Sequence, residues 1–484
     1  MMSQEDIHEN KIFIVNFSEL RGRLDPKISL YNRKVLHFAY PKAKLKALLL
    51  NSPQYGANES GISRKSNEEP RYIRITDIDE NGLISTNELG ATAEIVEDKY
   101  LLHENDILFA RSGATVGKTY IHKDLPYKCF FAGYLIRFVI DPQITIPDYV
   151  FIFTQLNIYK EWVNAIQRPS GQPNINAEEY QSLEIPLPDI KIQKKLVNIY
   201  LKSLSNKQQK EQEAKDLLNS IDDYLLSELG IERPSPIRTE NGRFFYTSHK
   251  EVTGKRLDPL AYSERTKLLK QSITSGKYSC STLKSLIIQE SAGDWGIDVT
   301  DDYDESIYSK CLVLRSTEFN LYHNIVVDNS KAKYRLISNR KLDSIDLQPN
   351  DLIIEKSGGS ENQPVGRIAI ITKDLYERDR LCYSNFVQKI RLDNSQVIPT
   401  YACFFLRLVH NMRLTETMQS QTNGIRNLIL SEYYNQQIPI PPIEKQKEII
   451  YHIGTLYNRA KQLQHEATTI LSDAKQEIEQ MILG

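Results

Sequence analysis

The chain contains two copies of the same series of short motifs, and this internal repeat restricts its fold more than any other feature. Five matched blocks occur in the same order in both halves. They begin at Arg23, Asn105, Ile146, Gly171 and Ile185 in the first half and at Arg256, Asn350, Ile398, Gly424 and Ile438 in the second half. So many blocks in one order are hard to obtain by chance, which indicates a duplication. The separation between copies grows over the early blocks and is then constant, so we expect a shared framework with different loop insertions, where binding specificity usually lies.

Each half begins with a segment that mixes strands and helices. Short β-rich runs are bounded by turn residues, as at 71–75, 106–110 and 134–140. Helical stretches interrupt them, and we expect one from Tyr149 to Ala165 and its counterpart from Tyr401 to Thr417, each just after a proline. The pattern predicts an α+β fold for both segments.

Each half ends in a long amphipathic helix that follows a proline-rich hinge, at 186–188 or 439–442. Apolar residues recur at spacings of three and four over several heptads, which is typical of a coiled-coil seam. Polar residues interrupt the seam of the first helix at Ser203, Lys207 and Lys210, so this helix needs a partner. A single helix of this kind could pack on its own domain, but two at equivalent places favour a pair. About 38 residues of helix span roughly 57 Å.

The sequence therefore predicts a pseudo-two-fold α+β protein in which two duplicated globular domains are joined by an antiparallel coiled coil of two long helices. We expect the first domain at residues 1–188 and the first spacer helix at 189–232. We expect the second domain at 233–442 and the second spacer helix at 443–484.

Composition limits the class of function. The chain has 61 Lys and Arg against 62 Asp and Glu, so it cannot bind a polyanion through bulk charge, and any nucleic-acid site must be a local patch. The polar, acidic start is unlike a signal peptide, and apolar runs such as Ala47–Leu50 are too short to span a membrane. Five widely spaced cysteines without a Cys-x-x-Cys pair argue against a disulfide framework or a zinc finger. We expect a cytoplasmic protein.

Catalytic motifs are absent from the sequence. The segment Gly113–Thr119 resembles a phosphate-binding loop, but only three residues separate its glycines where four are needed, and the second half has Val365-Gly366-Arg367 there. A tight glycine turn between strands explains it better. There is no Asn-Pro-Pro-Tyr-type methyltransferase loop, no His-Glu-x-x-His and no Gly-x-Ser-x-Gly. We therefore predict a non-catalytic chain without metal or cofactor. A nucleotide hydrolase at the Gly113 loop is the alternative.

Basic residues concentrate at matching places in the two halves, from 111 to 137 and from 356 to 391, where they outnumber acidic residues. Two DNA-facing surfaces on a neutral protein would need such excesses, although lysines that merely solvate a strand face produce the same pattern. Base contacts require Arg, Lys, Asn or Gln on loops that can enter the major groove. The candidates are Arg64, Lys65, Arg111, Lys118, Arg168 and Gln172 in the first half and Arg315, Lys356, Asn362, Gln363, Arg367 and Arg426 in the second half.

Together, the Arg-Leu-Asp-Pro block at Arg23, the segment Asn105–Gly113, the block Gln172–Ile175 and the hinge Ile185–Pro188 with Gln193 resemble the specificity (S) subunit of type I restriction–modification systems. The resemblance implies that each half holds a target-recognition domain that reads one part of a split duplex DNA sequence. It implies that the helices set the gap between the parts and bind methyltransferase (M) subunits. It also implies that partner chains, including the restriction (R) subunits, carry out methylation and cleavage. An assembly scaffold that binds no DNA is a further alternative.

Overall fold

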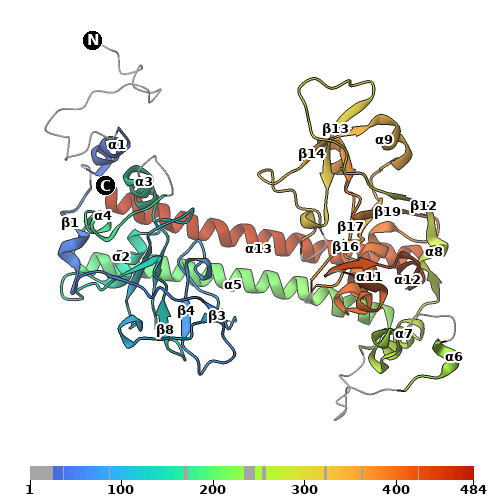
Figure 1. The fold of residues 1–484 in the computed structure, drawn as a ribbon, viewed down its shortest axis with the longest axis horizontal. Coiled ribbons are helices and arrows are strands. Elements are labelled where there is room, and N and C mark those ends of the chain that lie inside the picture. The colour runs from blue at the N-terminus through green and yellow to red at the C-terminus, as the bar shows by residue number, and fades with distance from the viewer. Residues whose placement is uncertain are drawn as a thin grey trace. The chain divides into compact units, whose positions relative to one another are not determined.

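The computed structural model describes residues 26–35, 38–86, 88–167, 173–233, 246–252, 258–320, 324–360, 363–422 and 424–484. The chain forms two units, one comprising Met1–Glu211 with Gln464–Gly484 and the other Gln212–Leu463. Each unit combines one globular domain with parts of two long helices, α5 (Ile190–Leu229) and α13 (Ile443–Leu483), drawn in green and red in Figure 1. Among the described residues, no helix has both the length and the apolar character that a membrane span requires.

The main sheet of each globular domain has four antiparallel strands in the same order. The order is β2-β9-β6-β7 in the first unit and β12-β19-β15-β17 in the second. The strands are β2 (Gln54–Tyr55), β6 (Ile107–Ala110), β7 (Thr119–Ile121) and β9 (Leu135–Phe138), and β12 (Ile287–Ala292), β15 (Leu352–Glu355), β17 (Ile368–Ile370) and β19 (Val387–Leu392). This correspondence confirms the duplicated α+β fold.

Two further strand pairings are shared. Each unit has a parallel strand pair, in which β4 pairs with β8 in the first unit and β13 pairs with β18 in the second. An antiparallel pair joins the start of each domain to its hinge, β1 with β10 and β11 with β22. These strands are β1 (Lys42–Lys44), β4 (Arg71–Ile73), β8 (Cys129–Phe131), β10 (Glu184–Pro186), β11 (Cys280–Thr282), β13 (Tyr308–Leu314), β18 (Leu381–Tyr383) and β22 (Gln437–Pro439).

The remaining strands differ between the units. The first has β5 (Ala91–Thr92) next to β4 and β3 (Ile62–Ser63) next to β5, whereas the second has β14 (Tyr334–Ser338) next to β13. The second unit also has a sheet of β16 (Ser357–Gly358), β21 (Ile425–Leu428) and β20 (Gln419–Thr422). The shorter helices are α1 (Pro26–Val35), α4 (Ala177–Gln181), α6 (His249–Val252), α7 (Glu264–Thr274), α8 (Leu283–Leu286), α9 (Asn339–Ile345), α10 (Lys373–Arg378) and α12 (Leu430–Tyr434).

The repeated Asn-Asp block is a turn that leads into the central strand. Asn105 and Asn350 have φ of 71° and 73°, a left-handed conformation that asparagine tolerates better than most residues. The following aspartates, Asp106 and Asp351, accept hydrogen bonds from backbone N–H groups three residues before them, at 3.0 and 2.8 Å. The strands that follow, β6 and β15, are fully buried and apolar apart from Glu355.

The predicted helical stretches are correct in place but wrong in length. Instead of one helix from Tyr149 to Ala165, the structure has α2 (Pro147–Phe153) and α3 (Asn157–Ile166). The interruption lies at Thr154, whose hydroxyl donates to the carbonyl of Phe151 at 2.6 Å and lies 2.6 Å from the hydroxyl of Thr119 on β7. The counterpart α11 (Pro399–Asn411) ends before Arg413, which has a φ of 61°, so the helix does not reach Thr417. The Arg-Leu-Asp-Pro blocks lie outside the described residues except for their last one or two positions.

A buried glutamine fastens each long helix to its globular domain. In the first unit Gln193 Oε1 accepts from the backbone N–H of Ile146 and from the hydroxyl of Thr145, both at 3.0 Å, while Nε2 donates to the carbonyl of Pro188 at 2.9 Å. In the second unit Gln446 Oε1 accepts from Ile398 N–H at 2.8 Å, and Nε2 donates to Pro441 at 2.8 Å. The repeated glutamine therefore links the hinge to the segment that begins α2 or α11.

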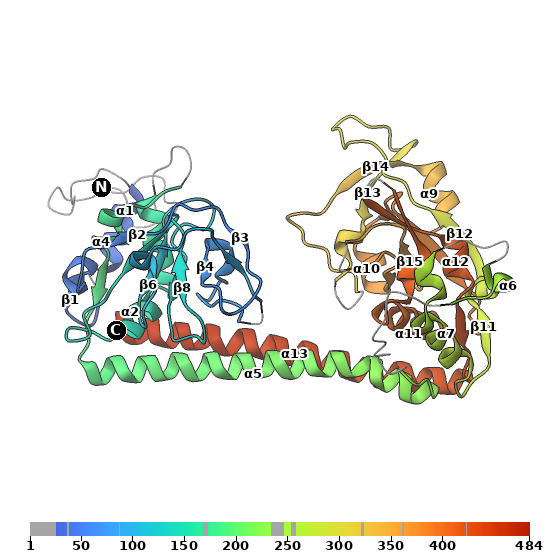
Figure 2. The ribbon, with the colours of Figure 1, turned by 60° about the horizontal axis from the view of Figure 1, so that its bottom comes forward.

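Helices α5 and α13 run side by side within each unit (Figures 1 and 2). In the first unit Leu196 and Tyr200 share a buried cluster with Ile478 and Ile482. In the second, the last turns of α5 share a cluster with the first turns of α13. Early residues of one helix therefore meet late residues of the other, which confirms the antiparallel pair. Polar cross-links follow the same pairing, with Lys210 to Glu466 at 2.5 Å in the first unit and Glu228 to Lys445 at 2.6 Å in the second.

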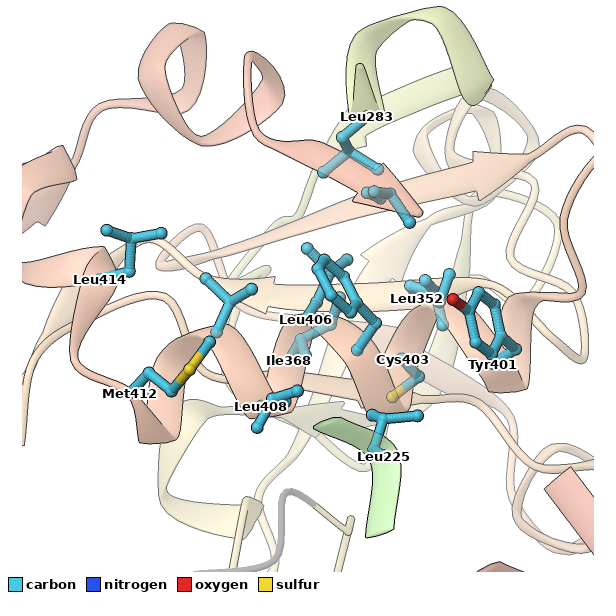
Figure 3. Packing of buried hydrophobic residues seen from close by; sticks show 14 of the residues in the cluster. Leu225, Leu283, Leu352, Ile368, Tyr401, Cys403, Leu406, Leu408, Met412 and Leu414 are labelled. Carbon is cyan, nitrogen blue, oxygen red and sulfur yellow. The ribbon is translucent and has the colours of Figure 1, made fainter. Parts of the chain in front are cut away.

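The helix pair also covers the core of each domain. Figure 3 shows this in the second unit, where Leu225 of α5 lies next to Cys403 of α11, and α11 packs on Leu352 and Ile368 of the main sheet. The long helices thus belong to the hydrophobic core and are not only connectors.

The glutamine at the hinge gives a first test of this fold. Gln193→Ala should lower the free energy of unfolding by about 2–3 kcal/mol, because it removes hydrogen bonds and leaves the buried hydroxyl of Thr145 and the part-buried N–H of Ile146 without an acceptor. Urea unfolding followed by circular dichroism measures the change. The exposed Gln143→Ala serves as the matched control and should change stability by less than about 0.5 kcal/mol. Equal effects of the two substitutions would contradict the structural role of Gln193.

Candidate nucleic-acid interface

A basic residue and an exposed aromatic residue are joined at the end of the same strand in both units. In the first unit Arg111 follows β6, and its N–H donates to the carbonyl of Tyr134 at 2.9 Å. In the second unit Lys356 follows β15, and its N–H donates to the carbonyl of Phe386 at 2.7 Å. Tyr134 and Phe386 lie in the turns before β9 and β19, and they are 62% and 55% exposed. Both rings are therefore accessible to another molecule, at equivalent places in the two units.

A Ser-Gly pair and an asparagine complete the arrangement in both units. Ser112 forms a β-bridge with Asn174, and Ser357 pairs with Asn427, whose Oδ1 accepts from the Ser357 hydroxyl at 2.6 Å. We call the two sets the strand-end clusters. The first consists of Arg111, Ser112, Tyr134 and Asn174, and the second consists of Lys356, Ser357, Phe386 and Asn427. A long cation, an amide and an aromatic ring are the side-chain types that contact phosphates and bases.

The two strand-end clusters differ in how the cation is held. The guanidinium carbon of Arg111 lies 4.9 Å from the ring centroid of Tyr55, and Tyr55 Oη accepts from the N–H of Ala177 at 3.2 Å. Arg111 Nε is buried and has no hydrogen-bond partner among the described residues. The pKa of Lys356 is below its ordinary value, first because the amine is partly buried and second because Lys341 is near.

Several of the sequence candidates use their hydrogen-bond donors inside the fold. Arg64 donates to the carbonyls of Glu69 at 2.7 Å and Leu89 at 3.2 Å, and its guanidinium lies 4.1 Å from the ring centroid of Tyr127. Lys118 donates to the carbonyl of Ile78 at 2.8 Å. Arg64 is only 3% exposed, so it supports the loop that it lies under.

The second unit shows the same feature. Arg367 forms a two-pronged ion pair with Glu355, with both contacts at 2.9 Å, and also donates to the carbonyls of Phe319 and Ser316. Both partners are buried. Arg315 pairs with Glu318 and donates to the carbonyl of Lys331 at 3.1 Å.

The structure brings together only part of the candidate set. Arg111 and Lys356 lie in the strand-end clusters, and Arg426 on β21 pairs with Gly358, next to the second cluster. Lys65 is exposed on the loop after β3. Gln363 lies in the loop after β16 and makes backbone hydrogen bonds with Ser360. Arg168, Gln172 and Asn362 lie outside the described residues.

The excess of basic residues in the two segments is largely paired internally. Arg137 bonds to Asp106, and Lys123 to Asp148. In the second unit the buried Lys389 lies 3.5 Å from Asp351, and Arg391 also pairs with that carboxylate, at 2.7 Å. The excess along the sequence therefore overstates the charge that these segments present at the surface.

The sequence interpretation missed the aromatic members of the clusters. Its candidates were chosen only among Arg, Lys, Asn and Gln, so neither Tyr134 nor Phe386 was among them. The available signal was position, because Tyr134 and Phe386 each stand directly before a strand, β9 or β19, and after turn-forming residues, at equivalent places in the repeat.

The Gly113 loop is a tight turn between β6 and β7, as expected. Its N–H groups are used within the chain, since Val116, Gly117 and Lys118 donate to the carbonyls of Gly113, Ala110 and Thr115 at 3.0–3.1 Å. Gly117 has a φ of 88°, and a Cβ there would approach Val163 to 2.6 Å. Amides already occupied in this way do not form a phosphate-binding cradle. Among the described residues there is no group of three or more His, Cys, Asp or Glu side chains placed to hold a metal ion.

Comparison with known proteins identifies the class. Residues 59–219 and 312–471, which together exceed half of the chain, match the model of the type I restriction modification DNA specificity domain. Two such domains on paired helices define a type I specificity protein. The chain belongs to the family of specificity subunits of type I restriction–modification systems, and it is a non-catalytic member of such a complex.

Individual relatives are distant. The specificity subunit of the type I restriction enzyme EcoKI from Escherichia coli is 20% identical over 423 residues, which cover 86% of this chain and 81% of that protein. The MjaVIII specificity subunit of Methanocaldococcus jannaschii is 22% identical over 106 residues, covering 22% of this chain and 24% of that protein. A structure solved in a study of complex assembly and conformational transition of the type I system has the same fold. Its TM-score is 0.50 at 13% identity, and the match covers 92% of this chain and 96% of that chain.

A stability measurement distinguishes cations that support the fold from cations that are available to bind a ligand. Arg367→Met should lower the free energy of unfolding by about 3–5 kcal/mol, because it leaves the buried Glu355 carboxylate unpaired. Lys356→Met keeps the apolar stem and should cost less than about 1 kcal/mol. Chemical unfolding of the full chain gives both values. The double variant Arg367→Met with Glu355→Met should be more stable than Arg367→Met alone, and the opposite order would contradict this assignment.

Proposed function

We propose that this chain recognises a bipartite duplex DNA target, one part with each globular domain, and directs the M and R subunits of its complex to that target. The supporting observation is that the strand-end cluster occurs at the equivalent position in both units. Membership in a family of DNA specificity domains favours the same function. We assign the recognition domains to residues 1–188 and 233–442 and the spacer helices to 189–232 and 443–484.

The chemistry of the clusters suits base and backbone contacts. Arg111, held against the Tyr55 ring, presents a planar set of donors that matches the O6 and N7 acceptors of guanine. Lys356 supplies a compact cation at the same place in the second unit. The exposed rings of Tyr134 and Phe386 offer apolar contact to a thymine methyl group or a sugar. In this proposal Lys65, Arg168, Gln172, Asn362, Gln363 and Arg426 are further contacts, and Arg64, Lys118, Arg315 and Arg367 position the loops.

The long helices are the proposed binding surface for the M subunits. Exposed apolar side chains stand on them in each unit, with Ile190 and Leu201 on α5 at 41% and 46% exposure and Tyr451 on α13 at 77%. Apolar residues with this exposure on a helix that already buries its seam favour a further protein contact.

Substitution in the clusters tests the DNA proposal. Arg111→Met should weaken binding to the target duplex about 5- to 150-fold, and should relax discrimination at one position of the first half-site only. Lys356→Met should act in the same way on the second half-site. Fluorescence anisotropy with the assembled methyltransferase measures affinity, and mapping of methylated bases reads out each half-site.

Lys46→Met, at an exposed lysine of the first domain that is not a member of the cluster, is the matched control and should change affinity little. Unchanged affinity in both cluster variants, with normal folding and assembly, would contradict the proposal. A complex that assembles but binds no DNA at all would favour the scaffold alternative.

The helices are also the proposed spacer between the two half-sites. Removing one heptad from each at equivalent places, residues 207–213 and 460–466, shortens each helix by about 10 Å, which corresponds to about 3 base pairs of duplex. We expect the methylated target to keep both half-sites and to lose about 3 base pairs from the gap. Sequencing of methylated bases measures the change, and an altered half-site with an unchanged gap would contradict the spacer role.

A further inference from the structure

The two long helices carry opposite charges at equivalent positions. Gln193 and Gln446 begin the equivalent helices, and the same alignment matches the buried Leu225 with the buried Ile478. In this register Asp222 of α5 corresponds to Lys475 of α13. Each of them lies where the end of its helix packs on the globular domain of the other half. Asp222 belongs to the second unit and Lys475 to the first.

In the second unit Asp222 meets a buried cation. Arg407 of α11 is 3% exposed, and its Nη2 donates to Asp222 Oδ1 at 3.2 Å. Asn411 Nδ2 donates to the other carboxylate oxygen at 2.8 Å. Arg407 also donates to the hydroxyl of Tyr457 on α13 and lies over the rings of Tyr457 and Phe404. The carboxylate therefore completes a set of contacts that neutralises a buried guanidinium.

In the first unit the equivalent place holds a lysine and not a carboxylate. Lys475 Nζ donates to Asn81 Oδ1 at 3.1 Å. Burial lowers the pKa of Lys475 to about 8, and Lys160 and Lys207 lower it further, whereas Glu80 and Asp79 act in the opposite direction. The residue that corresponds to Arg407 is Gln155, which is bonded to Thr119 at 2.8 Å and carries no charge. The two helix ends are thus matched to different domains.

We infer that the charges at 222 and 475 determine which helix end packs on which globular domain, and that they prevent the second halves of two chains from pairing with each other. In such a homotypic pair, α13 of one copy would take the place of α5 in the other. Lys475 of one copy would then lie against the buried Arg407 of its partner, with no carboxylate between them. Like charges forced together in a buried place are strongly unfavourable.

The apolar seam alone does not provide this selection. The residues that precede the two charges, Ile221 and Ala474, are both buried and apolar, as are Leu218 and Leu471. Equivalent seams can interchange, so specificity requires an element that penalises the wrong partner. If two first halves paired with each other, Asp222 of one copy would lie against Asn81 of the other, which has both acidic and basic neighbours. The discrimination between correct and homotypic pairing therefore rests on the second half. This inference does not depend on DNA recognition.

A cross-linking experiment on the full chain tests it. In the native pairing Lys210 lies opposite Glu466, and Glu213 lies opposite Arg459. Position 463 is the counterpart of 210, so two α13 helices in a homotypic antiparallel pair would bring their 463 positions together. A Leu463→Cys chain should form little disulfide-linked dimer under mild oxidation. Adding Lys475→Asp, which offers Arg407 a carboxylate from a second copy, should raise the dimer about ten-fold or more.

A second variant protects the test against misfolding of the first. The double variant Asp222→Asn with Arg407→Gln removes both charges of the Asp222–Arg407 pair, which lies in the second unit. It leaves the first unit unchanged and should also raise the yield of the cross-link between 463 positions. Lys461→Asp, at an exposed position of α13, is the charge-matched control and should leave the cross-link at its starting level. No increase in either test variant, with circular dichroism showing folded chains, would overturn the inference. An equal increase with Lys461→Asp would overturn it too.

Discussion

Burial of the apolar faces of two long helices against each other is the interaction on which the rest of this structure depends. The seam of α5 is interrupted by Ser203, Lys207 and Lys210, and a helix of this kind cannot bury its apolar face alone. Its partner α13 comes from the other copy of the duplicated sequence. Because the pair is antiparallel, each globular domain receives the start of its own helix and the end of the other. Each domain therefore packs on one helix from each copy of the duplicated sequence.

The hinges attach each globular domain to its long helix at a defined place. A proline-rich strand end brings the chain to the helix, and the first turns of the helix place a glutamine under the domain. Tyr149 and Tyr401 donate to the carbonyls of Pro186 and Pro439 at 2.7 and 2.9 Å, which adds a second buried bond at the same place. These repeated residues hold the joint between helix and domain, which is why they stay alike while the loops differ.

Periodicity and repetition predicted most of the framework. The spacing of apolar residues identified the two helices, and the order of matched blocks identified two domains with one architecture, including the strands that contain Ile107–Ala110 and Leu135–Phe138. The break at Thr154 was missed because it depends on a hydroxyl contact with Thr119, a residue on a separate strand. Tertiary contacts of this kind have no signature in local sequence.

The site was harder to predict than the fold, because counting charges along the chain does not show which of them are already paired. Arg367 and Lys356 look alike as cations in a loop, yet one neutralises Glu355 in the core and the other stands at a strand end next to an exposed ring. Candidates chosen by residue type thus contained both supporting and surface groups. Equivalence between the two halves is the better guide, since a feature kept at the surface of both copies is not required by the core of either.

The same comparison explains how one framework can serve two different halves. The strand order, the hinge glutamines and the Ser-Gly pairs are common to both units, and a cation and an aromatic ring lie at the same point of each domain. What differs is the identity of the groups, with Arg111 on Tyr55 in one unit and Lys356 near Lys341 in the other, and with Lys475 and Asp222 at the two helix ends. A framework stabilised by buried contacts tolerates exchanges at the strand-end clusters, which lie at its surface, at little cost in stability. Two copies of one fold can then present two distinct surfaces, provided that the helix ends keep unlike halves together. Selective pairing and divergent strand-end clusters are therefore complementary properties, because a chain that paired like halves would present the same surface twice.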